Sequence, residues 1–334
     1  MKDRILTVLR KIDVPLLCVI LGIFTVYFQF HFSLDTEFIK TICVRQHRLV
    51  LANKMYAPSQ YRILNTYIIE WIIRLFRLLS IATPEYRAFT VVRVLQNSGI
   101  FYLGYLYWGT YGIKKPLLIV AIMSLGWGFL NANFSSMLAF DTYTDILLYL
   151  TAGIFIKGGK YFLIIPIAIL AGLNRETGGL IPFMYLVSIL DFHQKWGGLS
   201  KQKILIFIIS MLLFAFEFFY IRNVFGFHPT VYPYGKEFGW QLFVHNLTSR
   251  NAYFWFFVTL GIFPFFTIFN YRHLPDLLKR YFWIICPVWF IIHFFMGSVE
   301  ETRLFLVPQV IIFLPASFYI IQQSLINAPE VELN

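Results

Sequence analysis

Residues 204–221 read ILIFIISMLLFAFEFFYI, a run of eighteen residues in which Glu217 is the only charged side chain. An α-helix needs about 20 apolar residues to cross the roughly 30 Å hydrocarbon core of a bilayer, so this run predicts a transmembrane helix. The rest of the chain has the same character, because 58% of its 334 residues are hydrophobic and 13% are charged. Soluble domains carry about 25% charged residues. The composition therefore excludes a soluble enzyme, a disordered chain and a disulfide-rich secreted module, and it predicts a multi-pass membrane protein.

Ten apolar segments of this kind divide the sequence. They are 14–32, 88–108, 116–131, 141–157, 160–174, 177–191, 204–221, 252–270, 281–297 and 304–323. The fifth and sixth are short, so the region 160–191 fits either two tight spans or a broken hairpin. We predict an all-α transmembrane helical bundle of about ten spans, with roughly eight to eleven as the range. Residues 1–334 are expected to form a single transmembrane domain, since no repeat or linker divides them.

The basic residues predict which loops face the cytosol. The net charge is +11, but the lysines and arginines lie in short gaps between apolar runs. That placement encodes membrane topology and differs from the continuous basic patch of a nucleic-acid-binding protein, so no nucleic acid partner is expected. The short outer loops carry five basic residues, and the inner segments carry fourteen: Lys2, Arg4, Arg10, Lys11, Lys114, Lys115, Lys157, Lys160, Lys195, Lys201, Lys203, Arg272, Lys279 and Arg280. This excess predicts cytoplasmic N- and C-termini, with a first helix that is retained.

Two long segments, 33–87 and 222–251, are then extracytoplasmic. Within the first, 63–79 has an apolar side and a charged side, which predicts an amphipathic helix in the plane of the membrane interface. Such a helix either lines a site or simply lies on the membrane surface. Six acidic residues fall on the predicted inner side and eleven on the outer side or at outer span ends. Because charges inside a bilayer are costly, this distribution favours a chemical site on the outer face.

Asp35-Thr36-Glu37 follows the first predicted span directly. Two carboxylates beside the membrane can act as a general base or hold a divalent cation such as Mg²⁺ or Mn²⁺, and they can also be solvated acids that end a helix. Arg62 precedes the amphipathic helix. Its planar guanidinium can bind a phosphate, or it can extend to lipid headgroups.

Three further polar groups lie at predicted outer span ends. Asn174, Arg175 and Glu176 stand at the break between two apolar segments, where charges can face a cavity or form an ordinary turn. Asp141 and Asp145 share a helix face, so they need a cation, an arginine or a proton between them, unless Asp141 starts the helix and Asp145 bonds a neighbour. Glu301 and Arg303 occupy the turn before the last span and either touch substrate or close an ion network.

Four of these elements, in this order along the chain, resemble the GT-C superfamily of polytopic membrane glycosyltransferases. More closely they resemble bacterial GT-C-like or cell-surface glycopolymer formation proteins. The elements are the acidic triplet 35–37, Tyr61-Arg62-Ile63-Leu64, Asn174-Arg175-Glu176-Thr177 and Glu301-Thr302-Arg303. The family's acids are often adjacent, whereas Thr36 separates them here.

The resemblance implies a GT-C-like bundle in a bacterial inner (plasma) membrane. It further implies transfer of a sugar from a polyprenyl-phosphate carrier to a glycan, lipid or protein acceptor on the extracytoplasmic face. Asp35, or secondarily Glu37, would then be the base or hold the cation. Arg62, Arg175 and Arg303, together with Asp141, Asn174, Glu176 and Glu301, would contact substrate. Two alternatives stay open: an O-antigen-type polysaccharide polymerase, and a transporter or lipid flippase.

Overall fold

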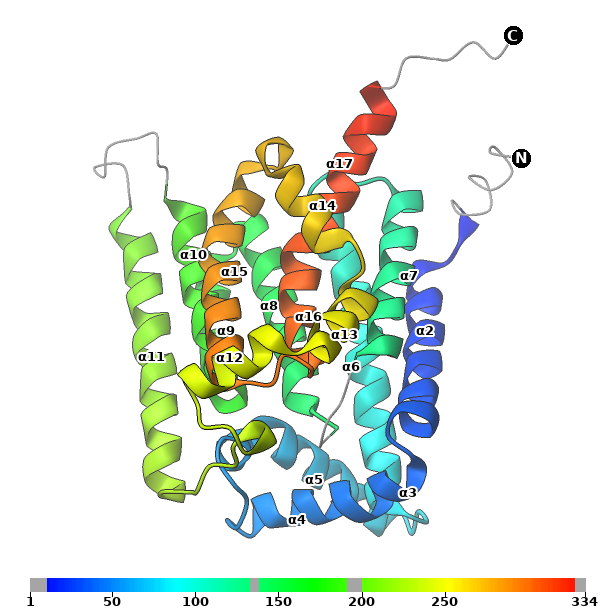
Figure 1. The fold of residues 1–334 in the computed structure, drawn as a ribbon, viewed down its shortest axis with the longest axis vertical. Helices are drawn as coiled ribbons and strands as arrows, with labels where there is room; N and C mark the ends of the chain where they lie inside the picture. Colours follow the sequence, from blue (N-terminus) through cyan, green and yellow to red (C-terminus); the bar gives the residue numbers. More distant parts are fainter. Residues whose placement is uncertain (1–10, 133–137, 191–199, 328–334) are drawn as a thin grey trace.

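The computed structural model describes residues 11–132, 138–190 and 200–327. These residues are mostly helical and contain no β-strand, although Ala57 and Thr230 form an isolated bridge. Figure 1 shows upright helices packed side by side, with shorter helices lying across one end of the bundle. Four of the predicted inner basic residues, Lys2, Arg4, Arg10 and Lys195, lie outside the described residues.

Among the described residues, four helical segments are long and apolar enough to cross a membrane. The first is α2 (Val14–Phe28) with η1 (Gln29–Ser33), the second is α11 (Lys201–Phe225) and the third is α15 (Asp276–Met296). The fourth runs through η9 (Thr302–Phe305), α16 (Leu306–Pro308), η10 (Gln309–Phe313) and α17 (Leu314–Asn327). A bent pair, α13 (Arg250–Leu260) and α14 (Phe263–Phe269), would make a fifth if it counts as one span.

The other predicted spans are also helical, but their length or polarity keeps them below that standard. They are α6 (Pro84–Gly109), α7 (Lys115–Asn131), α8 (Phe140–Lys157), α9 (Ile164–Asn174) after η4 (Tyr161–Leu163), and α10 (Leu180–Ile189) after η5 (Glu176–Gly179). Helices α7, α9 and α10 are short, whereas α6 and α8 carry charged side chains such as Arg93 and Asp145. The chain is therefore an all-helical protein with four or five apolar helices suited to a membrane.

The segment between α2 and α6 forms the helices that lie across the end of the bundle (Figure 1). In order they are α3 (Thr36–Phe38), η2 (Ile39–Cys43), α4 (Val44–Leu51), η3 (Ser59–Tyr61) and α5 (Ile63–Leu78). The helix predicted over 63–79 is present as α5. Of its charged residues Glu70 is buried, whereas Arg74 and Arg77 are exposed. Its apolar side is exposed as well, with Trp71 at 68% and Leu78 at 81%. An apolar exposed side of this kind suits contact with lipid.

The second predicted outer segment, 222–251, contains η7 (Pro233–Gly235) and α12 (Trp240–Thr248), and a further turn, η8 (Tyr271–His273), precedes α15. Gly261 explains why the single span predicted over 252–270 is broken. Its φ of +62° lies where L-residues rarely go, so the chain can turn there, and α13 and α14 meet at 82°. This bend is a correction to the straight helix expected from hydropathy.

The last helical segment occupies the middle of the bundle. Its apolar window is 89% buried within the protein, whereas that of α11 is 11% buried, which places α11 at the edge (Figure 1). The wide turn η10 loosens the backbone ladder and leaves carbonyls without helical partners. Trp108 Nε1 donates to the Val310 carbonyl at 2.8 Å, and Tyr107 donates to that of Ile311 at 3.2 Å. These bonds fasten α6 to the central segment.

Candidate functional site

Arg62 joins two carboxylates from distant parts of the chain at the start of α5. Its Nη1 lies 2.8 Å from Asp141 Oδ2, and its Nη2 lies 3.0 Å from Glu176 Oε2. Glu176 also accepts from Arg222 Nη2 at 2.9 Å, so it lies between two guanidinium groups. Burial alone would lower the pKa of Arg62, but the carboxylates of Glu176 and Asp141 outweigh it and raise that pKa. The guanidinium therefore stays charged.

Two more arginines donate hydrogen bonds to Thr142, which follows Asp141 at the start of α8. Arg175 Nη1 donates to its Oγ1 at 2.6 Å, and Arg303 Nη1 donates to the same oxygen at 2.8 Å. Arg175 Nε also lies 3.6 Å from Asp141 Oδ2, and Arg303 Nη2 donates to Glu301. The turn before the last helical segment thus meets the turn between α9 and α10.

Asn174 completes this contact between α5, α8 and α9. Its Nδ2 donates to the Asp141 carbonyl at 2.8 Å, and its Oδ1 accepts from Asn65 Nδ2 at 2.7 Å. Seven residues singled out in the sequence therefore come together: Arg62, Asp141, Asn174, Arg175, Glu176, Glu301 and Arg303. We call these seven, with Thr142, the arginine cluster.

Asp35 and Glu37 do not belong to the arginine cluster. Asp35 is exposed at the start of α3, where its carboxylate accepts from the Glu37 backbone amide at 3.2 Å. Glu37 is exposed as well. Neither carboxylate forms an ion pair within the described residues. Helix α3 packs mainly against η2, and it lies at the same end of the bundle as α5 (Figure 1).

Arg93, which lies in α6 and is fully buried, was not predicted as part of the site. Its guanidinium stacks over the Tyr143 ring at 3.8 Å and faces the Phe140 ring at 4.7 Å. None of its three nitrogens has a hydrogen-bond partner in the described part of the chain. It interacts electrostatically with Asp141 and Arg303, which places it beside the arginine cluster. The sequence did contain a signal for this residue, because an arginine inside the apolar segment 88–108 is costly and needs a reason.

The positive groups at this site outnumber the negative ones. Five arginines, 62, 93, 175, 222 and 303, face four carboxylates, Asp141, Asp145, Glu176 and Glu301. Within the described residues, the Nε atoms of Arg62, Arg175 and Arg303 donate no hydrogen bond. Buried donors without acceptors are costly, so the site is suited to an anion with several oxygen acceptors, such as a phosphate.

Across 11–132, 138–190 and 200–327, no group of three or more His, Cys, Asp or Glu side chains could hold a metal ion. The divalent cation suggested for the triplet 35–37 therefore stays a prediction. No family model, curated protein or solved structure matches the chain.

Proposed function

We propose that this protein is a GT-C-like membrane glycosyltransferase of about ten spans. It would move a sugar from a polyprenyl-phosphate carrier to a glycan, lipid or protein acceptor on the extracytoplasmic face of a bacterial inner membrane. One observation carries the proposal: the excess of buried arginines around Thr142, with Arg93 lacking any hydrogen-bond acceptor among the described residues. A lipid phosphate would supply the missing acceptors, and its isoprenoid tail suits an apolar helix bundle.

The arginine cluster has a role in the bond-breaking step. The oxygen of the acceptor hydroxyl bonds to the anomeric carbon, while the bond from that carbon to the phosphate oxygen breaks. The phosphate leaves with the electron pair, so its negative charge grows in the transition state. Guanidinium groups already in place stabilise that charge without reorganising, and such preorganised stabilisation makes the greatest contribution to catalysis in many enzymes.

Asp35 is our proposed base for the acceptor proton, with Glu37 as the secondary candidate. Two features support it. The carboxylate is exposed and forms no ion pair in the described residues, and Asp35 has a φ of +64°, where a non-glycine residue is strained. Asp141 and Glu176 are poorer bases, because each is held ionised between arginines.

The first test is sugar transfer by the purified full chain in proteoliposomes, using a labelled polyprenyl-phosphate sugar. Arg303→Gln should lower the transfer rate about a hundredfold, as the loss of one preorganised donor does in other enzymes. Asp35→Asn should lower it as well. Arg250→Gln is the matched control, since Arg250 is exposed and lies outside the arginine cluster. Unchanged turnover in both Asp35→Asn and Glu37→Gln would remove the triplet from the mechanism.

Arg93→Met gives a second test with two readouts of opposite sign. A buried unpaired ion costs several kcal/mol, whereas a desolvated cation–π contact returns about 2 kcal/mol. The burial cost is larger, so Arg93→Met should raise the melting temperature of the ligand-free protein while it lowers transfer at least tenfold. A lower melting temperature with normal transfer would mean that Arg93 has a structural role. The unpaired Arg93 would then no longer support the proposed function.

A transporter is the second candidate, because the apolar helices α13 and α14 are bent by 82° at a short break, and transporters bind substrate at breaks in helices. The same vesicles separate the two functions. Movement of the labelled carrier across the bilayer with no new glycosidic bond would favour transport and contradict the transferase.

A further inference from the structure

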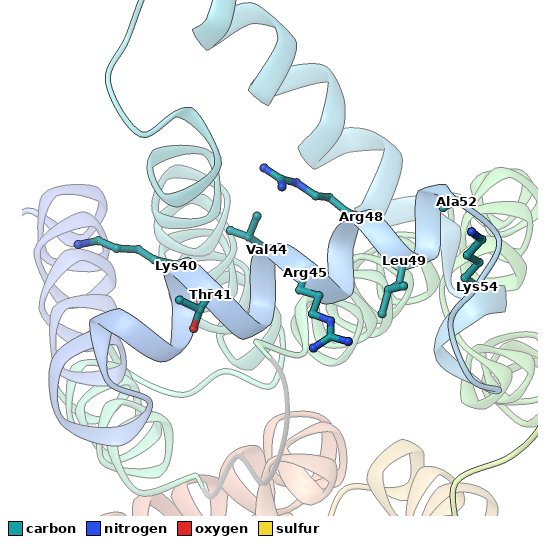
Figure 2. A pocket seen from close by; sticks show the side chains of 8 residues that line it. All are labelled: Lys40, Thr41, Val44, Arg45, Arg48, Leu49, Ala52 and Lys54. Atoms are coloured by element: carbon teal, nitrogen blue, oxygen red, sulfur yellow. The ribbon is translucent and has the colours of Figure 1, made fainter.

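A pocket of about 420 Å³ lies along η2 and α4, at the end of the bundle away from the ends of α2 and α17 that lead to the termini (Figures 1 and 2). Its lining residues recur at three- and four-residue spacing from Thr41 to Ala52, so they form one stripe on a helix. Lys54, just beyond the end of α4, lines one end of the pocket. The pocket is thus built almost wholly by one short stretch of chain.

The charge of this pocket is entirely positive. Lys40, Arg45, Arg48 and Lys54 line it, and no acidic side chain does. Figure 2 shows Arg48 pointing to one side of α4 and Arg45 to the other. Arg48 pairs with Glu85 at 3.1 Å.

The other three cations of the pocket have no acidic partner in the described part of the chain. Within the described residues, Lys40, Arg45 and Lys54 form no ion pair, and Lys40 Nζ lies 5.8 Å from the Tyr86 ring. Figure 2 shows Arg45 between Lys40 at one end of the stretch and Lys54 at the other, so an anion bound in the middle of the pocket would meet Arg45 and lie in the field of both lysines.

Apolar side chains accompany the cations and favour a lipid over a soluble anion. Val44 and Leu49 line the pocket. On the same segment Ile42 is 39% exposed and Leu51 is 37% exposed. The stretch follows the first apolar helix closely and lies across the helix axes (Figure 1). A helix with basic and apolar side chains in that position lies at the level of the lipid headgroups.

We propose that this pocket binds the phosphodiester headgroup of an anionic phospholipid from the surrounding leaflet. Arg45, near the middle of the pocket, contacts the phosphate, and Lys40 and Lys54 at its two ends add to the positive field that attracts it, while the glycerol and the first acyl carbons lie against Val44 and Leu49. The proposal is independent of the transferase, because it concerns a permanent lipid neighbour of α4 and not a reacting substrate.

Native mass spectrometry of the detergent-solubilised full chain, titrated with phosphatidylglycerol and with phosphatidylcholine, tests this. Wild type should retain phosphatidylglycerol at least tenfold more tightly than phosphatidylcholine. The combined change Lys40→Gln, Arg45→Gln and Lys54→Gln should weaken the phosphatidylglycerol site about tenfold or more. Arg48 is kept, because its ion pair with Glu85 holds α4 to α6.

Lys160→Gln, Lys201→Gln and Arg272→Gln together form the matched control, since they remove the same charge from exposed positions elsewhere. This control should bind phosphatidylglycerol as wild type does. Equal loss in both triple variants, or none in the pocket variant, would overturn the proposal. So would displacement of the lipid by glycerol phosphate or a soluble polyanion at concentrations that match the lipid's affinity, because the pocket would then take a soluble anion. Equal melting temperatures of the variants establish that all of them fold.

Discussion

His47 and Glu70 meet between α4 and α5, with 3.2 Å between Nε2 and Oε2. Arg74 Nε holds the other oxygen of Glu70 at 3.0 Å, and Glu85 and Arg48 also act on His47. Burial lowers the pKa of His47 below 6.5, although Glu70 raises it in part. Burial would raise the pKa of Glu70, but the hydrogen bonds from Arg74 and His47 outweigh it, and the net shift is downward. The folded protein therefore holds a neutral histidine beside a carboxylate.

This pair predicts how stability depends on pH. Below 6.5 the unfolded histidine binds a proton that the folded one resists, so acidification favours unfolding. Glu70 adds to this loss of stability only at lower pH, as the pH falls below 4.5 and then through the lowered pKa that Glu70 has in the folded protein. The melting temperature should fall between about pH 7.5 and about pH 5.5, and His47→Gln should flatten that slope. The exposed His273→Gln should follow wild type. An equal slope in His47→Gln would assign the acid sensitivity to another group.

Residue by residue, the cost of charge in an apolar chain identified most of the arginine cluster. Arg62, Asp141 and Glu176 stand beside apolar runs, so their presence needed a reason. Their pairing was not predictable, because the partners are 79 and 114 positions apart. Thr142 was missed because a threonine near a helix start carries no such cost. Asp35, also singled out in the sequence, forms no ion pair with these arginines within the described residues.

Helices α2 and α6 are held together by a close approach of their backbones. A Cβ built on Gly22 would lie 2.0 Å from Ser98 Oγ and 3.0 Å from the Ser98 backbone nitrogen. Rotation of the serine side chain would relieve the first contact but not the second. Helices inside membranes pack through such small residues, because there is little hydrophobic drive to bring them together.

Gly22→Ala should therefore separate α2 from α6 and lower the melting temperature by several degrees, in line with a typical overpacking cost of about 1–3 kcal/mol. Differential scanning fluorimetry in detergent measures it. Gly109→Ala is the control, since the nearest atom to its new Cβ lies 3.8 Å away. Its melting temperature should stay within a degree or rise, because alanine favours a helix by about 1 kcal/mol. A Gly22→Ala protein as stable as this control would contradict the packing.

The positions of the helices were largely predictable, because apolar length and charged gaps fix where a helix can run. Within the described residues, each of the ten apolar segments is largely helical, and α5 matches the predicted amphipathic helix closely. The breaks were not predictable from hydropathy. Gly261 and the wide turn η10 depend on backbone angles and on partners such as Trp108, which come from other parts of the chain.

For the whole molecule, the sidedness predicted from the basic residues agrees with one feature of the fold. Helix α2 begins and α17 ends at the end of the bundle opposite α3, α4 and α5 (Figure 1). Which end faces the cytosol rests on the positive-inside rule, and the proposed chemistry depends on it, since a polyprenyl-linked donor used outside requires the arginine cluster outside.

Cysteine labelling decides the orientation, because the three native cysteines, Cys18, Cys43 and Cys286, are all buried. Lys236→Cys, in the second outer segment, should react with a membrane-impermeant maleimide in intact cells. Lys160→Cys and Arg272→Cys, both exposed in predicted inner loops, should react only after permeabilisation. Wild type treated in the same way is the control for background labelling and should not react. The reverse pattern would place the triplet 35–37 and α5 in the cytosol and exclude an extracytoplasmic transferase. Labelling of all three sites in intact cells would contradict the alternating topology itself.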